Sequence, residues 1–276
     1  MFFAGAARVF HALGRRDLRR MNDVRKMILE SPQRLAEAAA RAVVEEARQA
    51  LEERGRFGIA LAGGTTPELA YRVLAENLRA DTDWSRWFVF FSDERYVAPN
   101  DPRSNYGMAW RFLLAYVPIP PAQIFPVPTN EPSVASAAAA YETRIKAFFA
   151  NGQPVFDVIL LGLGDDGHTA SLFPHSAALA ETQRLVASGP PGRLPPPVDR
   201  VTFTFPLINM ARAVYFLVAG AKKAPVLRKV FQPESTRAEC PAVGVRPRNG
   251  RVTFFLDRAA AGTDGPGILD SGPALR

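Results

Sequence analysis

The sequence predicts an α/β fold in which helices cover both faces of a doubly wound, mostly parallel sheet. Short apolar runs without polar alternation recur along the chain, and such runs are typical of strands that are buried on both faces of a parallel sheet. Segments with apolar residues at helical spacing separate these runs, which gives the strand–helix alternation of α/β proteins. No internal repeat interrupts the pattern, so we expect a single domain over residues 22–276.

The first predicted helix has clear end signals. The strand VRKMILE, Val24–Glu30, is followed by Ser31 and Pro32, a capping residue and a proline at the first helical position. The helix then runs to about Arg54, and its apolar stripe is formed by Leu35, Ala39, Val43, Ala47 and Leu51.

The remaining elements follow in the same alternation, and clusters of Gly and Pro separate them. Up to residue 128 the sequence predicts a strand at Phe57–Ala62, a helix from Pro67 to about Arg79, a strand at Trp87–Ser92, a polar loop, a helix from about Asn105 to Leu114 and a proline-rich connector at Val117–Pro128. Beyond it we expect helices at Ser133–Ala150 and Lys222–Phe231, and strands at Phe156–Leu163, Leu185–Ala187, Val201–Phe205, Ala213–Ala219 and Val252–Leu256.

The composition is that of an ordinary globular protein. Of the 276 residues, 47% are hydrophobic and 22% are charged. There is no apolar run of about 18 residues, so we expect neither a transmembrane helix nor a membrane partner. The single cysteine, Cys240, excludes an intramolecular disulfide and indicates a reducing compartment, from which we expect a cytoplasmic location.

The basic excess is concentrated near the N-terminal end. The net charge is +7, but residues 1–26 carry seven Lys or Arg and two Asp, which leaves only +2 for the rest. A nucleic-acid groove needs basic residues clustered on the folded body, so we expect no nucleic-acid partner. We interpret residues 1–21 as a disordered or loosely ordered basic extension without catalytic duty. Its Arg-rich, acid-poor composition is shared with organellar transit peptides.

The stretch AGGTTPELA, residues 62–70, is the first of three polar motifs at predicted strand ends, where open α/β sheets bind ligands. Gly63 and Gly64 let the backbone approach a ligand, while Thr65 and Thr66 offer hydroxyls. The free N–H groups of the helix that begins at Pro67 favour an anion. No Walker lysine follows, so the motif indicates a phosphate cradle or, alternatively, a plain strand–helix turn.

The second motif, FFSDERYVAPNDPRSNYGMA, residues 90–109, places charges directly after a strand. Runs of charge such as Asp93, Glu94 and Arg95 are usually solvated surfaces. Their position at the carboxyl end of a predicted strand nevertheless favours Arg95 as a ligand for an anion.

The third motif, DVILLGLGDDGHTASLFP, residues 157–174, contains the G-x-G-x-x-G spacing of a dinucleotide-binding loop. Asp165 and Asp166 lie inside the turn, where they would repel a pyrophosphate, and the spacing alone is weak evidence. We therefore interpret the glycines as a tight turn that presents His168 at the start of a helix. A helix N-terminus disfavours the imidazolium, so His168 should be neutral and able to accept a proton, with Asp166 orienting the ring or offsetting this effect.

Other chemistries find less support. The three histidines, His11, His168 and His175, lack metal-ligand spacing, so we expect no metal site. There is no G-x-S-x-G motif, and Ser171, one helical turn beyond His168, is expected to pack or cap rather than attack. The remaining hypothesis is a histidine that acts on water or on a substrate proton beside a phosphate.

The chain resembles the 6-phosphogluconolactonase family over roughly residues 57–260. The stretches that carry the resemblance are LAGGTTPELAYRVLA, FFSDERYVAPNDPRSNYGMA, FDVILLGLGDDGHTASLFP, RVTFTFPLINMARAVYFLVAGAKKAPVLRKV and FFLDRAAA. The resemblance implies a Rossmann-like α/β fold without metal, nicotinamide or other cofactor. It also implies hydrolysis of 6-phospho-D-glucono-1,5-lactone to 6-phospho-D-gluconate in the oxidative pentose phosphate pathway. We expect a monomer or a small homo-oligomer.

The resemblance also implies roles for particular residues. His168 would be the general base that activates water for attack on the lactone carbonyl. Asp93, Asn105 and Asp166 would line the same cleft. The residues that would hold the sugar phosphate are Gly63, Gly64, Thr65, Thr66, Arg95 and Lys223, the last within GAKKA.

Two alternatives remain on the same fold. Glucosamine-6-phosphate deaminase/isomerases also carry a DGH turn, but the stretches DERYVAP and DGHTASLFP of this chain favour the lactonase. A non-catalytic sugar-phosphate-binding protein is the other alternative, and the presence of both His168 and the phosphate residues argues against it.

Overall fold

Six strands form a central sheet that is parallel throughout. The computed structural model describes residues 24–150, 152–191 and 197–262, so the predicted basic extension over residues 1–21 lies outside the described residues. All neighbouring strands pair in parallel, and the three central ones are fully buried, so the predicted α/β sheet is confirmed. In sheet order the strands are β1 (Val24–Leu29), β9 (Arg251–Asp257), β8 (Ala213–Val218), β5 (Val158–Leu161), β2 (Phe57–Leu61) and β3 (Trp87–Phe91).

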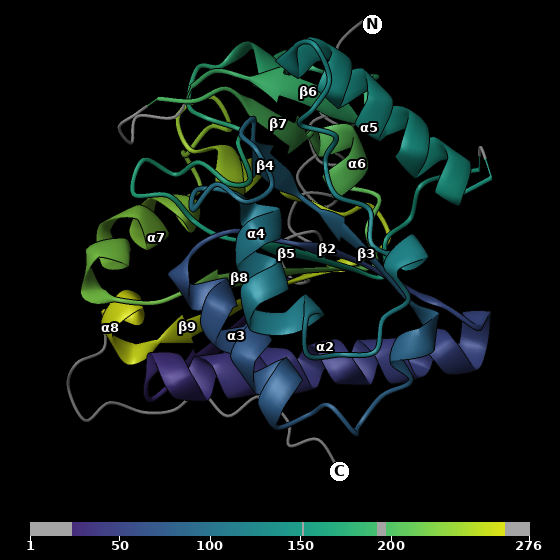
Figure 1. Cartoon of the computed structure of the whole chain (residues 1–276). Helices are drawn as coiled ribbons and strands as arrows, with labels where there is room; N and C mark the ends of the chain where they lie inside the picture. Colours follow the sequence, from purple (N-terminus) through teal and green to yellow (C-terminus); the bar gives the residue numbers. More distant parts are fainter. Residues whose placement is uncertain (1–23, 151, 192–196, 263–276) are drawn as a thin grey trace, which may run out of the picture.

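Helices cover both faces of this sheet (Figure 1). The long helix α2 (Pro32–Arg54) packs with α3 (Thr65–Glu76) on one face, and α5 (Val134–Phe148) lies on the opposite side. As predicted, the Ser31 hydroxyl caps α2, because it accepts the backbone N–H of Arg34 at 3.2 Å.

A second, antiparallel sheet of three strands was not predicted. It consists of β4 (Asp93–Arg95), β7 (Arg200–Phe203) and β6 (Val186–Gly189), with β7 in the middle, and α5 packs against it. The prediction of a polar loop at 93–95 is wrong. The strands predicted at Leu185–Ala187 and Val201–Phe205 exist but belong to this antiparallel sheet and not to the parallel one. A three-residue polar strand has no hydrophobic period by which it could be detected.

The predicted helices at 105–114 and 222–231 are each divided into two turns of different geometry. The divided and remaining short helices are α4 (Asn105–Ala109), a π-helical turn (Trp110–Leu114), a 3₁₀ turn (Ala221–Lys223), α7 (Ala224–Val230), α6 (Phe205–Ile208) and α8 (Arg258–Ala261).

Among the described residues no helix is long and apolar enough to cross a membrane.

The sheet order brings four segments of the chain to one edge. Strands β8, β5, β2 and β3 are consecutive neighbours, and neighbouring strands lie about 4.8 Å apart. The segments that follow them carry Lys223, His168, Gly63 and Asp93 respectively. These four residues therefore lie close together at the carboxyl edge of the sheet, where α/β sheets bind ligands.

Candidate active site

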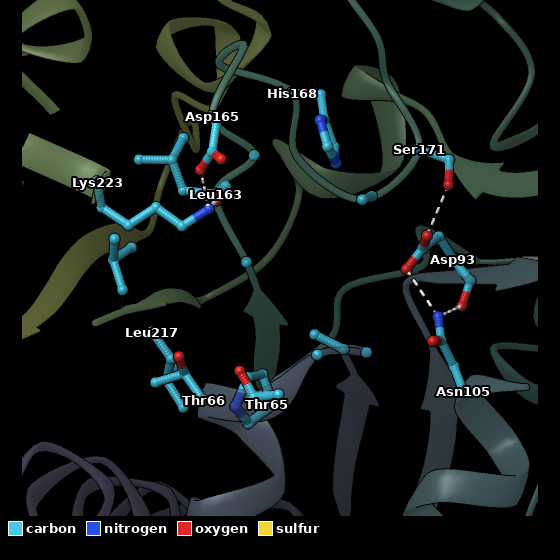
Figure 2. A pocket seen from close by; sticks show the side chains of 18 of the residues that line it. Thr65, Thr66, Asp93, Asn105, Leu163, Asp165, His168, Ser171, Leu217 and Lys223 are labelled. Carbon is cyan, nitrogen blue, oxygen red and sulfur yellow. Dashed lines mark hydrogen bonds and ion pairs between the residues drawn. The ribbon is translucent and has the colours of Figure 1, made fainter. Parts of the chain in front are cut away.

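A cavity of about 520 Å³ opens at this edge. In Figure 2, Lys223 and Asp165 lie on one side of it, Asp93, Asn105 and Ser171 on the other, and His168 opposite Thr65 and Thr66. The structure brings together all ten residues that the sequence proposed for the site, namely Gly63, Gly64, Thr65, Thr66, Asp93, Arg95, Asn105, Asp166, His168 and Lys223.

The glycine loop after β2 supplies an anion-binding helix start. The helix α3 begins at Thr65, two residues before the predicted start at Pro67, and Gly64 is its cap. The proline fits the first turn because no helical hydrogen bond requires its missing N–H. The N–H groups of Thr65 and Thr66 likewise have no acceptor within the helix, and both residues line the cavity, so they can bind an anion.

Gly63 allows this loop to contact α4. A Cβ atom at Gly63 would lie only 2.0 Å from Oδ1 of Asn105, so any other residue would displace that side chain. The amide of Asn105 donates to the carbonyl and to the carboxylate of Asp93, at 2.9 and 3.1 Å. The glycine loop and β4 are thereby held against each other.

His168 lies on a tight turn that fixes its ring. Its Nδ1 is 2.6 Å from Oδ1 of Asp166, which also accepts the backbone N–H of His168 at 3.1 Å. The ring covers Gly164, where a Cβ atom would be 2.0 Å from Nδ1. Phe173 contacts the ring from elsewhere on the turn, with centroids 4.6 Å apart. The imidazole is thus oriented by three neighbours.

The prediction that His168 opens a helix is wrong. Residues 165–174 form successive turns, closed by a bridge between Thr169 and Leu172, because Thr169 bonds the Gly162 carbonyl instead of extending a helix. A helix dipole therefore does not control the imidazole. Asp166 does, since an ionised carboxylate can only accept, which makes Nδ1 the donor and leaves Nε2 as the acceptor.

Asp166 is ionised under all ordinary conditions. Burial raises the pKa of its carboxyl, but hydrogen bonds from the ring and backbone N–H of His168, together with the ring's charge, outweigh this effect and lower the pKa to about 2. The pair can therefore hold one neutral tautomer of the imidazole.

Lys223 closes the opposite side of the cavity. Its Nζ donates to the Leu163 carbonyl at 2.7 Å and to the Asp165 carboxylate at 2.6 Å. Asp165 is largely exposed, and ion pairs with such groups contribute little. The ammonium can consequently exchange this partner for a bound phosphate.

Asp93 is committed to a buried network. Its Oδ2 accepts the hydroxyl of Ser171 at 2.6 Å, while its Oδ1 accepts the amide of Asn105. Ser171 is buried and does not lie on a helix with His168, so its predicted helical placement is wrong. Both residues support the cavity wall.

Glu94 is buried, in contrast to the solvated surface that is usual for a run of charges. Its carboxylate accepts the backbone N–H groups of Arg95, Asn105 and Tyr106 at 2.7–2.8 Å and the Ser104 hydroxyl at 3.0 Å. Burial raises its pKa to about 7. Glu94 therefore fixes the start of α4 and, through it, Asn105.

Arg200 and Asp165 also line the cavity, although neither was predicted as a site residue. A charged residue at the start of the apolar strand RVTF was the available signal for Arg200. The antiparallel pairing of β7 with β4, which brings it to the site, was not anticipated. Cys240 is buried away from the cavity lining, and burial raises the pKa of its thiol.

Residues 30–254 match the sequence profile of a family described as glucosamine-6-phosphate isomerases/6-phosphogluconolactonase. This match spans well over half of the chain. The chain belongs to this family. The resemblance seen in the motifs is thereby confirmed.

Relatives within the family cover most of the chain. A 6-phosphogluconolactonase of Synechocystis sp. is 44% identical over 236 residues, which are 84% of this chain and 95% of that protein. The human 6-phosphogluconolactonase is 37% identical, covering 85% and 91%. The solved 6-phosphogluconolactonase from Trypanosoma cruzi superposes with a TM-score of 0.77 at 33% identity, covering 87% of this chain and 96% of that one.

The fold extends to the other branch of the family. A monomeric glucosamine-6-phosphate deaminase superposes with a TM-score of 0.74 over 87% of this chain, but at only 19% identity. That likeness concerns the fold alone.

Proposed function

We propose that this chain hydrolyses 6-phospho-D-glucono-1,5-lactone to 6-phospho-D-gluconate, the lactonase step of the oxidative pentose phosphate pathway. Two lines of evidence support the proposal. The relatives that cover most of the chain at 37–44% identity are named 6-phosphogluconolactonases. The cavity combines an oriented imidazole with an anion-binding helix start and a lysine, which suit a lactone that carries a phosphate.

The contact between Asp166 and His168 carries the proposed mechanism. With Nδ1 donating to Asp166, Nε2 is free to take a proton from water as that water attacks C1 of the lactone. The tetrahedral intermediate carries a negative oxygen that needs hydrogen-bond donors. Its collapse breaks the bond from C1 to the ring oxygen, which receives the proton from the imidazolium and becomes the 5-hydroxyl. The new carboxylic acid then releases a proton to solvent.

The other cavity residues hold the substrate in this proposal. The N–H groups of Thr65 and Thr66, presented by Gly63 and Gly64, bind the phosphate together with Lys223 and Arg95. Asp93 and Asn105 keep these groups in register through their mutual hydrogen bonds. The reaction consumes only water, so the proposal assigns no cofactor.

One pair of assays separates the two branches of the family. The purified chain should form 6-phosphogluconate from the lactone, followed by NADP reduction in a coupled assay after subtraction of spontaneous hydrolysis. It should release no ammonia from glucosamine 6-phosphate, because deamination also requires proton transfer between C1 and C2 of an open-chain amino sugar. Ammonia release at a rate comparable to lactone hydrolysis would overturn the assignment.

A further inference from the structure

Two arginines lie directly opposite each other on neighbouring strands of the small sheet. Arg95 on β4 and Arg200 on β7 are register partners in the antiparallel ladder, and both line the cavity. Residues directly opposite in such a ladder have Cβ atoms about 5 Å apart, and like charges there are destabilising. The pair therefore requires a compensating interaction.

The protein itself leaves these guanidinium groups incompletely bonded. Arg200 is only 6% exposed. Within the described part of the chain, Nε of Arg95 and Nε of Arg200 are buried without any hydrogen-bond partner. Arg95 donates through Nη1 to the carbonyl of Arg103 at 2.5 Å. Buried donors are almost always satisfied in folded proteins, so the protein alone does not supply a full set of acceptors for the pair. Both arginines line the cavity, where a bound anion can supply acceptors for their other N–H groups.

The nearby carboxylates do not fill this role. Asp93 uses its two oxygens for Asn105 and Ser171, and Glu94 is held by backbone N–H groups and the Ser104 hydroxyl. Their charges nonetheless act on Arg200. Burial, and next the charge of Arg95, lower the pKa of Arg200, while Asp93 and Glu94 oppose this effect. The carboxylates thus offset part of the positive charge and leave the guanidinium N–H groups available.

The arginine pair adjoins the phosphate-binding helix start. Gly63 contacts Asn105, and Asn105 is bonded to Asp93 at the first position of β4. A ligand anion at Thr65 and Thr66 is therefore next to the strand that carries Arg95. Guanidinium groups match the geometry of phosphate oxygens better than an ammonium does.

We propose that Arg200 is a substrate-binding residue that joins Arg95 in gripping the phosphate group of the sugar phosphate. This inference rests on the proposed function and deepens it. The phosphate carries the only charge of the lactone substrate, so it is the group that can neutralise two adjacent guanidinium charges. Arg200 therefore contributes to ligand binding and not to the stability of the unliganded protein.

Arg200→Met tests this inference, with Arg251→Met as the matched control. Arg251 is also partly buried, but it has an ion-pair partner in Glu46 and lies outside the cavity. Thermal unfolding is measured with and without inorganic phosphate. Without phosphate, Arg200→Met should unfold at the same or a higher temperature than the native chain, and phosphate should no longer raise that temperature. Arg251→Met should lower the unfolding temperature and retain the phosphate response.

Kinetics with two lactones provide the second readout. Arg200→Met should raise KM for the 6-phosphorylated lactone roughly 10- to 100-fold, as expected for one lost charge-assisted bond. The preference in kcat/KM for the phosphorylated lactone over unphosphorylated glucono-1,5-lactone should fall by the same factor, and Arg200→Lys should have a KM between those of the native chain and Arg200→Met. A lower unfolding temperature with an intact phosphate response would overturn the inference in favour of a structural role. A loss of kcat on both lactones with KM unchanged would overturn it in favour of a role at the lactone carbonyl.

The two proposals fail in different ways. If the native chain hydrolysed neither lactone but phosphate still stabilised it through Arg200, the lactonase assignment would fail while the anion site stood. If the chain hydrolysed the phosphorylated lactone and Arg200→Met left both KM and the phosphate response unchanged, the lactonase assignment would stand while the role of Arg200 failed.

Discussion

The Asp166 carboxylate decides which ring nitrogen of His168 can accept a proton. In Asp166→Asn the side-chain amide can donate to Nδ1, which favours the tautomer with its proton on Nε2. We expect kcat to fall about 10²- to 10⁴-fold with little change in KM, as is known for buried acid–histidine pairs. Asp165→Asn removes the same charge from the same turn without touching the ring, so steady-state assays should show a far smaller loss of kcat. Equal losses in the two variants would contradict the orienting role.

Lys223 should act on binding and not on the chemical step. Lys223→Ala removes a charge-assisted contact of about 1.5–3 kcal/mol, so KM for the phosphorylated lactone should rise at least tenfold. Lys222 precedes it on the same turn but is exposed and does not line the cavity. Lys222→Ala should therefore keep the native KM. The assignment of Lys223 fails if the two alanine variants have the same KM.

At the scale of residues, the sequence was informative where motifs follow buried strands. Gly63, His168 and Lys223 could be placed in one site because the carboxyl ends of parallel strands share an edge. The reason for the glycines could not be predicted in full. Gly63 and Gly164 leave space for the side chains of Asn105 and His168, respectively. These contacts join residues whose proximity depends on the fold, so they could not be predicted from the sequence. Arg200 was missed for the same kind of reason.

Among the elements, β4 and α4 depend on Glu94. The folded state raises the pKa of Glu94 to about 7, against 4.5 for an ordinary carboxyl, so between these pH values the folded chain binds more protons than the unfolded chain. Stability from this group is therefore present below pH 4.5 and is lost as the pH rises through 7, by on the order of 3 kcal/mol.

Glu94→Gln removes this titration. Urea unfolding at pH 5 and pH 7 should show a smaller pH-dependent loss of stability in the variant than in the native chain. The variant should also be less stable overall, because an amide nitrogen cannot accept the bonds that one carboxylate oxygen receives. An unchanged pH dependence in Glu94→Gln would show that another group is responsible.

Elements with a clear hydrophobic period were predicted close to their observed bounds. α2 has such a period, and Ser31 and Pro32 marked its start correctly, while the inner strands of the central sheet were recognised as continuous apolar runs. β4 and the turns around His168 have none, because hydrogen bonds from polar side chains, not apolar spacing, determine their shape. These were also the elements that were assigned wrongly.

For the whole molecule, the fold class followed from alternation alone, but the arrangement of strands did not. Nothing in the local sequence specifies that β1 pairs with β9 or that β4, β6 and β7 form a separate sheet. Strand pairing depends on packing across the complete chain. The cavity is a product of that arrangement. Residues from β8, β5, β2 and β3 meet there only because these strands are neighbours.

The most direct test of the account is kcat of His168→Ala for 6-phosphoglucono-1,5-lactone, measured in the NADP-coupled assay with spontaneous hydrolysis subtracted. His175→Asn is the matched control, because His175 is exposed, lies outside this cavity and has a φ of 59°, which asparagine tolerates. We expect kcat of His168→Ala to fall about 10²- to 10⁴-fold while 6-phosphogluconate still binds, and the control to remain near the native rate. A folded His168→Ala protein with near-native kcat would contradict the account.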